Sequence, residues 1–261
     1  MGVPDAMKQI VFFSGGSGSA IAAKRIVDEF GPDDMVLLFN DTKMEDEDLY
    51  RFLDDAAEWI GVPVTTIADG RNPWEVFRDK KFIGNSRIDP CSQVLKRDLT
   101  KRWIKNNFDE DNITVVIGID WTEVHRFERF SIRNPKWKCR APLCEKPYLN
   151  KQDMLDQIEA AGIKIPRMYS QGFSRNNCGG ACVKAGMAQW ELLLRVNYKR
   201  YRWHEEKERE LREMLGDHSI LSEVKDGVKK PMSLQAFRER LEKQPDLFDK
   251  DDWGGCGCAI D

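Results

Sequence analysis

The chain has 261 residues, of which 41% are hydrophobic and 33% are charged, a balance typical of a folded globular protein. Its 41 Lys and Arg residues against 44 Asp and Glu residues give a net charge of −3, which excludes a protein-wide attraction to nucleic acid or to membranes. No apolar run reaches the roughly 20 residues of a membrane span, and the first ten residues lack a secretory signal pattern. We therefore expect a cytoplasmic protein whose seven cysteines serve metal, cluster or thiol chemistry rather than disulfides.

Strand-like and helix-like segments alternate along the first half of the chain. Continuous apolar runs predict four buried strands, at 8–13, 35–39, 64–67 and 114–119. Amphipathic stripes predict helices between them, at 20–30, 45–60 and 98–108. This alternation is typical of an α/β fold, a parallel sheet with helices on both faces.

The pattern changes after about residue 130, where helices are predicted at 151–161 and 186–215 and a short one near 233–243. We divide the chain into a nucleotide-binding α/β domain at residues 1–130 and a helical, cysteine-bearing region at 131–261. The helix beginning at 186 carries basic and aromatic residues, but its acidic residues nearly cancel them, so we interpret it as an ordinary amphipathic helix.

A loop rich in glycine and serine follows the first predicted strand directly; its residues are Ser14, Gly15, Gly16, Ser17, Gly18 and Ser19. Glycines let the backbone approach a ligand closely, and the amides and dipole at the start of the next helix favour an anion. The loop therefore predicts phosphate or pyrophosphate binding, with a tight turn capped by serines as the alternative. It lacks the Gly-Lys-Ser/Thr ending of a Walker loop and the Rossmann glycine register.

Five segments, in order along residues 8–190, resemble motifs of one superfamily. The glycine loop resembles the PP-loop of the ATP pyrophosphatase (adenine nucleotide alpha-hydrolase) superfamily, written S-G-G-x-D-S. The other four resemble its phosphoadenosine phosphosulfate (PAPS) reductase branch. They are Phe39-Asn40-Asp41-Thr42, the segment from Asp89 through Cys91 to Lys96 and Arg97, Gly118-Ile119-Asp120 with Glu123 and Arg126, and the segment from Pro166 through Tyr169 and Gly172-Phe173 to Cys178.

The resemblance implies that the loop binds ATP or another adenine nucleotide, with Mg²⁺ as a candidate companion. The implied nucleotide contacts outside the loop are Asn40, Asp41, Thr42, Gly118, Asp120 and Arg126, with Lys96 and Arg126 holding the far anion. The superfamily has an aspartate where this chain has Gly18. This replacement removes a charge that Mg²⁺-assisted cleavage of ATP would use.

Two close cysteine pairs lie in glycine-rich loops: Cys178 with Cys182, and Cys256 with Cys258. Two pairs of thiolates fit a tetrahedral zinc site or an iron–sulfur cluster, and their spacing does not choose between them. The resemblance to the PAPS reductase branch implies a different assignment of roles to the cysteines. There Cys91, Cys178 and Cys182 ligate a [4Fe–4S] cluster, while Cys256 or Cys258 is the fourth ligand or the reactive thiol. Cys139 and Cys144 are interpreted as incidental.

Three functions follow as hypotheses. The preferred one is a PAPS reductase-like oxidoreductase or an enzyme acting at the α-phosphate of ATP, with a tail thiolate and Lys96 at the reacting centre. The second is a transferase that uses ATP to insert sulfur into, or otherwise modify, RNA or DNA, with a thiol or sulfur-donor protein as partner. The third is a non-catalytic nucleotide-binding module with structural zinc. Each is compatible with a homo-oligomer.

Overall fold

The computed structural model describes residues 7–243 and 252–254. Its centre is a five-stranded parallel sheet with the order β3-β2-β1-β4-β5. The strands are β1 Lys8–Phe12, β2 Met35–Asn40, β3 Val64–Ile67, β4 Ile113–Val116 and β5 Lys138–Arg140. This is a Rossmann-like α/β domain, consistent with an adenine nucleotide alpha-hydrolase-like fold, and it confirms the predicted fold class.

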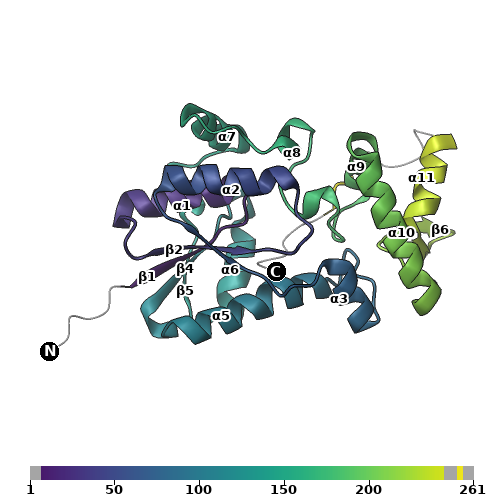
Figure 1. The fold of residues 1–261 in the computed structure, drawn as a ribbon, viewed down its shortest axis with the longest axis horizontal. Coiled ribbons are helices and arrows are strands. Elements are labelled where there is room, and N and C mark those ends of the chain that lie inside the picture. Colours follow the sequence, from purple (N-terminus) through teal and green to yellow (C-terminus); the bar gives the residue numbers. More distant parts are fainter. Residues whose placement is uncertain (1–6, 244–251, 255–261) are drawn as a thin grey trace.

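Helices cover both faces of the sheet (Figure 1). Three of them lie on one face: α1 Ser17–Phe30, α2 Glu47–Ile60 and α7 Lys151–Ala160. Two lie on the other: α5 Leu99–Asn107 and α6 Val124–Arg133. Successive strand residues point to opposite faces, so Leu37 packs in the core under α1 and α2 while Leu38 packs in the core over α5 and α6.

The chain runs outward from β1 to β3 and then returns to place β4 beside β1. In sheets of this kind the crevice at such a reversal, beyond the carboxyl ends of the strands, is where ligands bind. The loop after β1 and the loop after β4 therefore meet at the predicted ligand-binding edge.

The sheet includes elements from beyond residue 130. Strand β5 pairs with β4, and α7 packs on α1, so the α/β layers extend past the division predicted at residue 130. The signal for β5 is weak because this three-residue strand, Lys-Cys-Arg, contains no apolar run. Helix α6 was also missed, since its apolar stripe is interrupted by charged residues.

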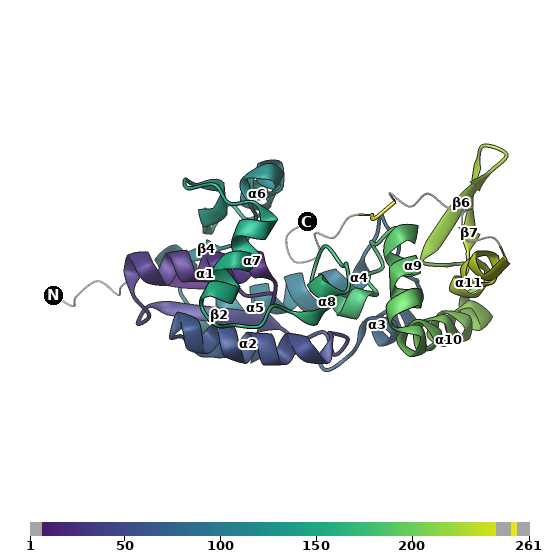
Figure 2. The same ribbon diagram turned by 90° about the horizontal axis from the view of Figure 1, so that it is seen from above.

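The C-terminal part forms a separate core beside helix α3 Pro73–Lys80 (Figures 1 and 2). It contains α9 Met187–Val196, α10 Tyr198–Leu215, the antiparallel hairpin β6 Leu221–Lys225 and β7 Val228–Met232, and α11 Leu234–Lys243. The single helix predicted at 186–215 is two helices, because Asn197 has non-helical backbone angles and accepts a hydrogen bond from the Arg200 amide. None of the helices in residues 7–243 has the length and apolar character needed to cross a membrane.

Short elements complete the fold. α4 Pro90–Ser92 runs into a π-helical turn, Gln93–Asp98, and α8 Arg167–Ser170 lies ahead of the cysteine loop. The 3-10 turns are Glu110–Asn112, Trp121–Glu123, Pro142–Cys144 and Cys178–Gly180. Residues 252–254 return to the start of α9, where the amides of Gly186 and Ala188 donate to the carbonyls of Trp253 and Asp252.

Candidate functional site

A cleft of about 460 Å³ opens at the carboxyl ends of β1 and β4. Nine of the predicted site residues line it: Ser14, Gly16, Ser17, Gly18, Ser19, Lys96, Gly118, Asp120 and Arg126. They come from the glycine loop, the π turn, the loop after β4 and helix α6. The volume is within the range of small-molecule sites, so the cleft is large enough for a nucleotide.

The first turn of α1 presents backbone donors to this cleft. Ala20 is the first residue whose amide bonds back along the chain, to the Gly16 carbonyl, so the amides of Gly18 and Ser19 have no partner within the helix itself. A Cβ on Gly18 would lie 2.8 Å from the Gly118 carbonyl oxygen, and a Cβ on Gly118 would lie 2.6 Å from the Ser19 nitrogen. Glycine at position 18 is thus explained by close backbone contact between the two loops.

Tyr169 and Lys151 occupy one edge of the glycine loop. The Tyr169 hydroxyl accepts the Ser17 amide at 3.1 Å, and Lys151 Nζ donates to Ser17 Oγ at 2.7 Å. The Lys151 ammonium also lies 3.8 Å from the centre of the Tyr169 ring, a cation–π distance. The phenol oxygen is therefore the acceptor for one backbone amide of the loop.

Arginines neutralise the carboxylate that faces the cleft. Arg126 donates to Glu123 at 2.7 Å, and Arg175 donates to the same carboxylate at 3.0 Å. Burial acts to raise the pKa of Glu123, but the two guanidinium groups outweigh it and leave that pKa below its ordinary value. Asp120 caps the following turn by accepting from the Thr122 amide. With Lys96 and Lys151 also lining the cleft, its charge is positive on balance.

A buried acceptor also faces the cleft. Asn176 is 3% exposed, and its Nδ2 donates to the Gly15 carbonyl at 2.7 Å. Its Oδ1 has no hydrogen-bond partner among the described residues. A buried polar atom without a partner is costly, and a ligand donor in the cleft would satisfy it.

The predicted residues after β2 are placed differently. Asp41 does not line the cleft; its carboxylate accepts from the Lys43 amide at 2.8 Å and the Tyr50 hydroxyl at 2.9 Å. Although burial acts to raise the pKa of Asp41, these bonds and the Lys43 ammonium lower it. Asn40 accepts from the Thr100 hydroxyl, and Thr42 belongs to the neighbouring pocket described next.

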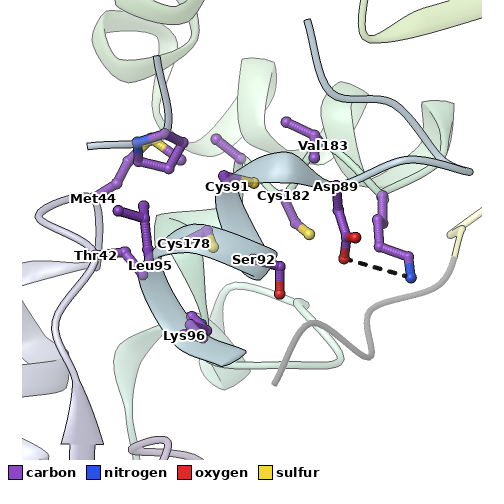
Figure 3. Close-up of a pocket in the computed structure, with 13 residues that line it drawn as sticks. Thr42, Met44, Asp89, Cys91, Ser92, Leu95, Lys96, Cys178, Cys182 and Val183 are labelled. Atoms are coloured by element: carbon purple, nitrogen blue, oxygen red, sulfur yellow. Dashed lines mark ion pairs between the residues drawn. The ribbon is translucent and has the colours of Figure 1, made fainter. Parts of the chain in front are cut away.

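Three predicted cysteines line one small pocket beside the cleft (Figure 3). Cys91 comes from α4, and Cys178 and Cys182 come from the loop that precedes α9. Lys96 and Lys184 line the same pocket. Neighbouring cations lower the pKa of thiols and favour the thiolate form that binds metals and attacks electrophiles.

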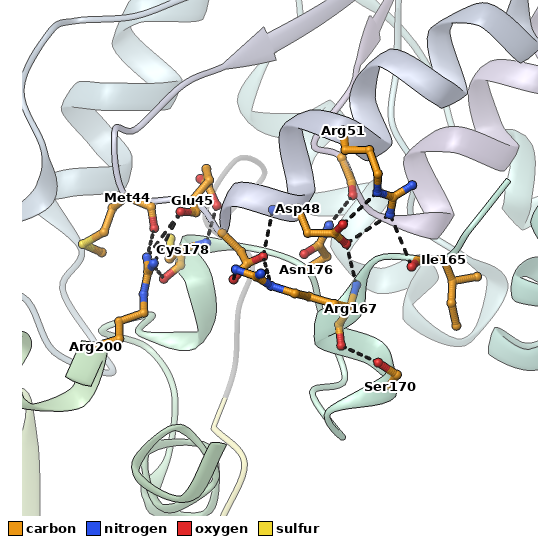
Figure 4. A network of polar contacts seen from close by, with 12 residues as sticks. Met44, Glu45, Asp48, Arg51, Ile165, Arg167, Ser170, Asn176, Cys178 and Arg200 are labelled. Carbon is orange, nitrogen blue, oxygen red and sulfur yellow. Dashed lines mark hydrogen bonds and ion pairs between the residues drawn. The ribbon is translucent and has the colours of Figure 1, made fainter. Parts of the chain in front are cut away.

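The Cys178 loop is held by contacts with α10 and with the loop before α2 (Figure 4). The Cys178 amide donates to the buried Glu45 carboxylate, and the Arg200 guanidinium donates to the carbonyls of Met44, Glu45 and Cys178. Cys178 itself has a φ of +49°, which is rare for a residue with a side chain. Surrounding bonds thus fix a strained backbone at a thiol, a situation often associated with functional sites.

The pocket offers the kind of ligand atom that binds zinc or an iron–sulfur cluster, but the described residues do not form a complete coordination site. Three sulfur-bearing side chains surround it, which matches the cysteine preference of zinc and iron–sulfur sites. Within residues 7–243 and 252–254, no group of three or more His, Cys, Asp and Glu side chains is arranged to hold a metal ion. The described residues therefore supply three candidate ligands and need another contribution to complete a site.

The other four cysteines divide into two groups. Cys139 and Cys144 lie away from the pocket, on β5 and in the turn Pro142–Cys144, where burial raises the pKa of each thiol. Cys256 and Cys258 fall outside the described residues. The sequence places them two and four residues after Gly254, and Gly254 lines the cleft at the glycine loop.

Lys96 belongs to both cavities. It lines the cleft with the glycine loop and the pocket with the cysteines, and its Nζ lies 3.9 Å from Glu45 Oε1. The two sites predicted separately, one for an anion and one for thiol chemistry, are therefore neighbours.

Several site residues were not identified from the sequence. Lys151, Arg175 and Asn176 line the cleft, and Glu45 and Arg200 hold the Cys178 loop. Tyr169, Arg175 and Asn176 lie in the segment from Pro166 to Cys178, which carries a recognisable sequence motif, so a signal for them existed. Lys151, Glu45 and Arg200 are charged residues whose role depends on tertiary contacts.

Comparison with known proteins adds a similarity but no activity. No protein-family model matches the chain. A protein of Methanocaldococcus jannaschii, described as uncharacterized, is 24% identical over 176 residues, which is 65% of this chain. The match spans 35% of the length of that protein.

Proposed function

We propose that this protein is an enzyme that binds an adenine nucleotide at the glycine loop and performs sulfur chemistry at its phosphate end. The observation that carries the proposal is the shared Lys96, which joins the cleft of the loop to the pocket of Cys91, Cys178 and Cys182. A nucleotide whose phosphates lie on the loop would then place its reactive end beside the thiols.

The loop residues bind and orient the phosphates in this proposal. The amides of Gly18 and Ser19 donate to phosphate oxygens, and the helix dipole of α1 adds to their effect. Lys151 and Arg126 supply positive charge on two sides. Tyr169 gives up its bond to the Ser17 amide, so that this amide also becomes available to the nucleotide.

The reaction that fits best is reduction of an adenylated sulfate. A cysteine thiolate attacks the sulfur, an S–S bond forms, and the S–O bond to the phosphate breaks. The nucleotide leaves with the electron pair as its phosphate anion, and the enzyme carries a thiosulfonate. Lys96 and Arg126 stabilise the negative charge on the departing oxygens. The nucleophile is Cys256 or Cys258 in this proposal, with Asp252 and Trp253 tying the preceding segment to α9.

Cys91, Cys178 and Cys182 would hold a [4Fe–4S] cluster or, alternatively, zinc, with a tail cysteine completing the set. Such a group would fix the three thiolates of the pocket in place, and a cluster would also supply electrons near the reacting sulfur. Glu45 and Arg200 keep the Cys178 backbone in position for this role.

The test measures nucleotide turnover and metal content on the same protein preparation. We expect anaerobically purified protein to release sulfite and adenosine phosphate from PAPS or its adenylyl analogue in the presence of a dithiol, and to contain stoichiometric iron and sulfide. Cys178→Ser or Cys182→Ser should abolish the metal content, whereas Cys139→Ser, a matched change on β5, should preserve it. Absence of adenine-nucleotide binding and turnover would refute the proposal; zinc without iron would select the zinc alternative.

An ATP-dependent nucleic-acid-modifying enzyme is the second candidate. It shares the loop and the thiols, and it differs in forming pyrophosphate from ATP rather than sulfite from PAPS. A groove lined by Arg87, Lys229 and Lys230 favours this candidate, because Arg87 lies only four residues before Cys91 in the sequence.

A further inference from the structure

A second, separate groove lies where the β6–β7 hairpin meets the loop 85–87. This hairpin groove has a volume of about 250 Å³ and is bounded by residues 85–87, 218–222 and 229–231. In Figure 2 the hairpin lies at the end of the molecule far from β1. Its lining includes Arg87, Lys229 and Lys230, together with His218, and contains no carboxylate. A chain with a net charge of −3 thus concentrates positive charge here.

The carboxylates nearest to the groove along the chain are already engaged. Glu223, opposite Lys230 in the hairpin, forms a two-point ion pair with Arg240, which lowers the pKa of that carboxyl. Asp217, next to His218, pairs with Arg212 at 2.5 Å. The ion pairs within the described residues do not include Arg87, Lys229 or Lys230.

We propose that the hairpin groove binds the phosphodiester backbone of a nucleic acid. Arginine, lysine and serine hydroxyls, here including Ser86 and Ser222, are the groups that contact phosphates and sugars. A protein partner would instead favour aromatic anchors, and the groove has none; of its apolar members, Ile220 and Leu221 are 4% and 5% exposed, and the exposed Pro231 is small. Without a stacking platform, recognition rests on phosphates and is independent of sequence.

The groove and the thiol pocket are joined by one short loop. Asn85 closes a turn by accepting from the amides of Arg87 and Ile88, and the chain continues through Asp89 to Cys91. Cys91 is four residues after Arg87, a stretch that spans at most about 14 Å when extended. A strand bound in the groove therefore lies a few nucleotides from the thiols. The binding itself does not depend on the nucleotide chemistry proposed above.

The experiment measures binding of the full chain to fluorescein-labelled 20-nucleotide single-stranded RNA and DNA and to a duplex, by anisotropy at several salt concentrations. Three phosphate contacts on a single strand predict a salt slope of about −2. The variant Arg87→Gln/Lys229→Gln/Lys230→Gln should bind at least tenfold more weakly at low salt and show a slope near zero. The matched control, Lys101→Gln/Lys105→Gln/Lys164→Gln, removes three exposed charges elsewhere and should bind as wild type does.

Each outcome decides the inference. Preference of one strand type identifies the nucleic acid, and unchanged melting temperatures show that both variants are folded. Equal loss in the two triple variants would mean that net charge, not the groove, governs binding. If polyglutamate displaced the labelled RNA as well as unlabelled RNA does, the ligand of the groove would be an acidic protein instead of a nucleic acid. The absence of binding at low salt would overturn the inference. The sulfite-release assay is a separate measurement, and its result decides only the proposed enzyme activity.

Discussion

The contact between Gly18 and Gly118 makes Gly118→Ala a direct test of the glycine-loop cradle. A Cβ on Gly118 would lie 2.6 Å from the Ser19 nitrogen and 2.7 Å from the Gly18 carbonyl carbon. Both obstacles are backbone atoms, so the start of α1 must move by roughly 1 Å to restore ordinary contacts of about 3.5–4.0 Å. Overpacking of this kind costs about 1–3 kcal/mol, which corresponds to a melting temperature lower by roughly 2–12 °C.

The same displacement moves the phosphate donors. A shift of about 1 Å takes an amide out of hydrogen-bonding distance, and a bond to a charged group is worth about 1.5–3 kcal/mol. We expect affinity for an adenine nucleotide, measured by calorimetry, to fall by about 10- to 150-fold. Gly162→Ala is the control, because Gly162 also resists a side chain (φ +79°) but has open space around it and lies outside the cleft. If Gly118→Ala binds and melts as wild type does, the cradle argument is wrong.

Three other substitutions test separate contacts. Tyr169→Phe frees the Ser17 amide, so nucleotide affinity by calorimetry should rise by about 2- to 10-fold; a fall would mean that the hydroxyl contacts the nucleotide instead. Glu45→Gln weakens the bond from the Cys178 amide, and we expect about 1–3 kcal/mol lower stability and faster alkylation of Cys178 by iodoacetamide, followed by mass spectrometry; an unchanged alkylation rate would contradict the clamp. Burial raises the pKa of Glu208 to about 7, so the folded state holds a proton that the unfolded carboxyl releases above about 4.5. Stability in urea should therefore decrease, by on the order of 3 kcal/mol, as pH rises from 4.5 to 7, and Glu208→Gln should remove this slope; a wild-type slope of the opposite sign would refute it.

The sheet was predictable because its strands are buried on both faces. Runs such as Ile10 to Phe12 and Met35 to Phe39 are apolar without interruption, and only a covered parallel strand requires that pattern. Strand β5 escaped prediction because a partly exposed edge strand of three residues needs no apolar run. The break at Asn197 escaped as well, since apolar residues continue at helical spacing on both sides of it.

The candidate site was partly predictable for a topological reason. Loops that follow parallel strands share one edge, so Ser14 and Gly118 had to be neighbours once the strands were identified. The resemblance further brought Cys91 together with Cys178. By contrast, Lys151 reaches Ser17 and Arg200 reaches Met44 across more than a hundred residues of sequence, and no local pattern distinguishes these cations from those on the surface.

The π turn at Gln93–Asp98 gives Lys96 its double position. Residues five apart diverge by about 140° around an α-helix, whereas a π turn bonds residue i to i+5 and brings such residues to one side. Cys91 lies in α4, two residues before this turn, and Lys96 lies within it; both line the same pocket. Removing a single residue from this turn would restore α-helical winding and rotate everything downstream by roughly 100°. The one extra residue of the π turn thus decides whether the lysine lines both cavities or faces elsewhere. Related chains with and without this residue should therefore differ in chemistry even when their sheets are alike.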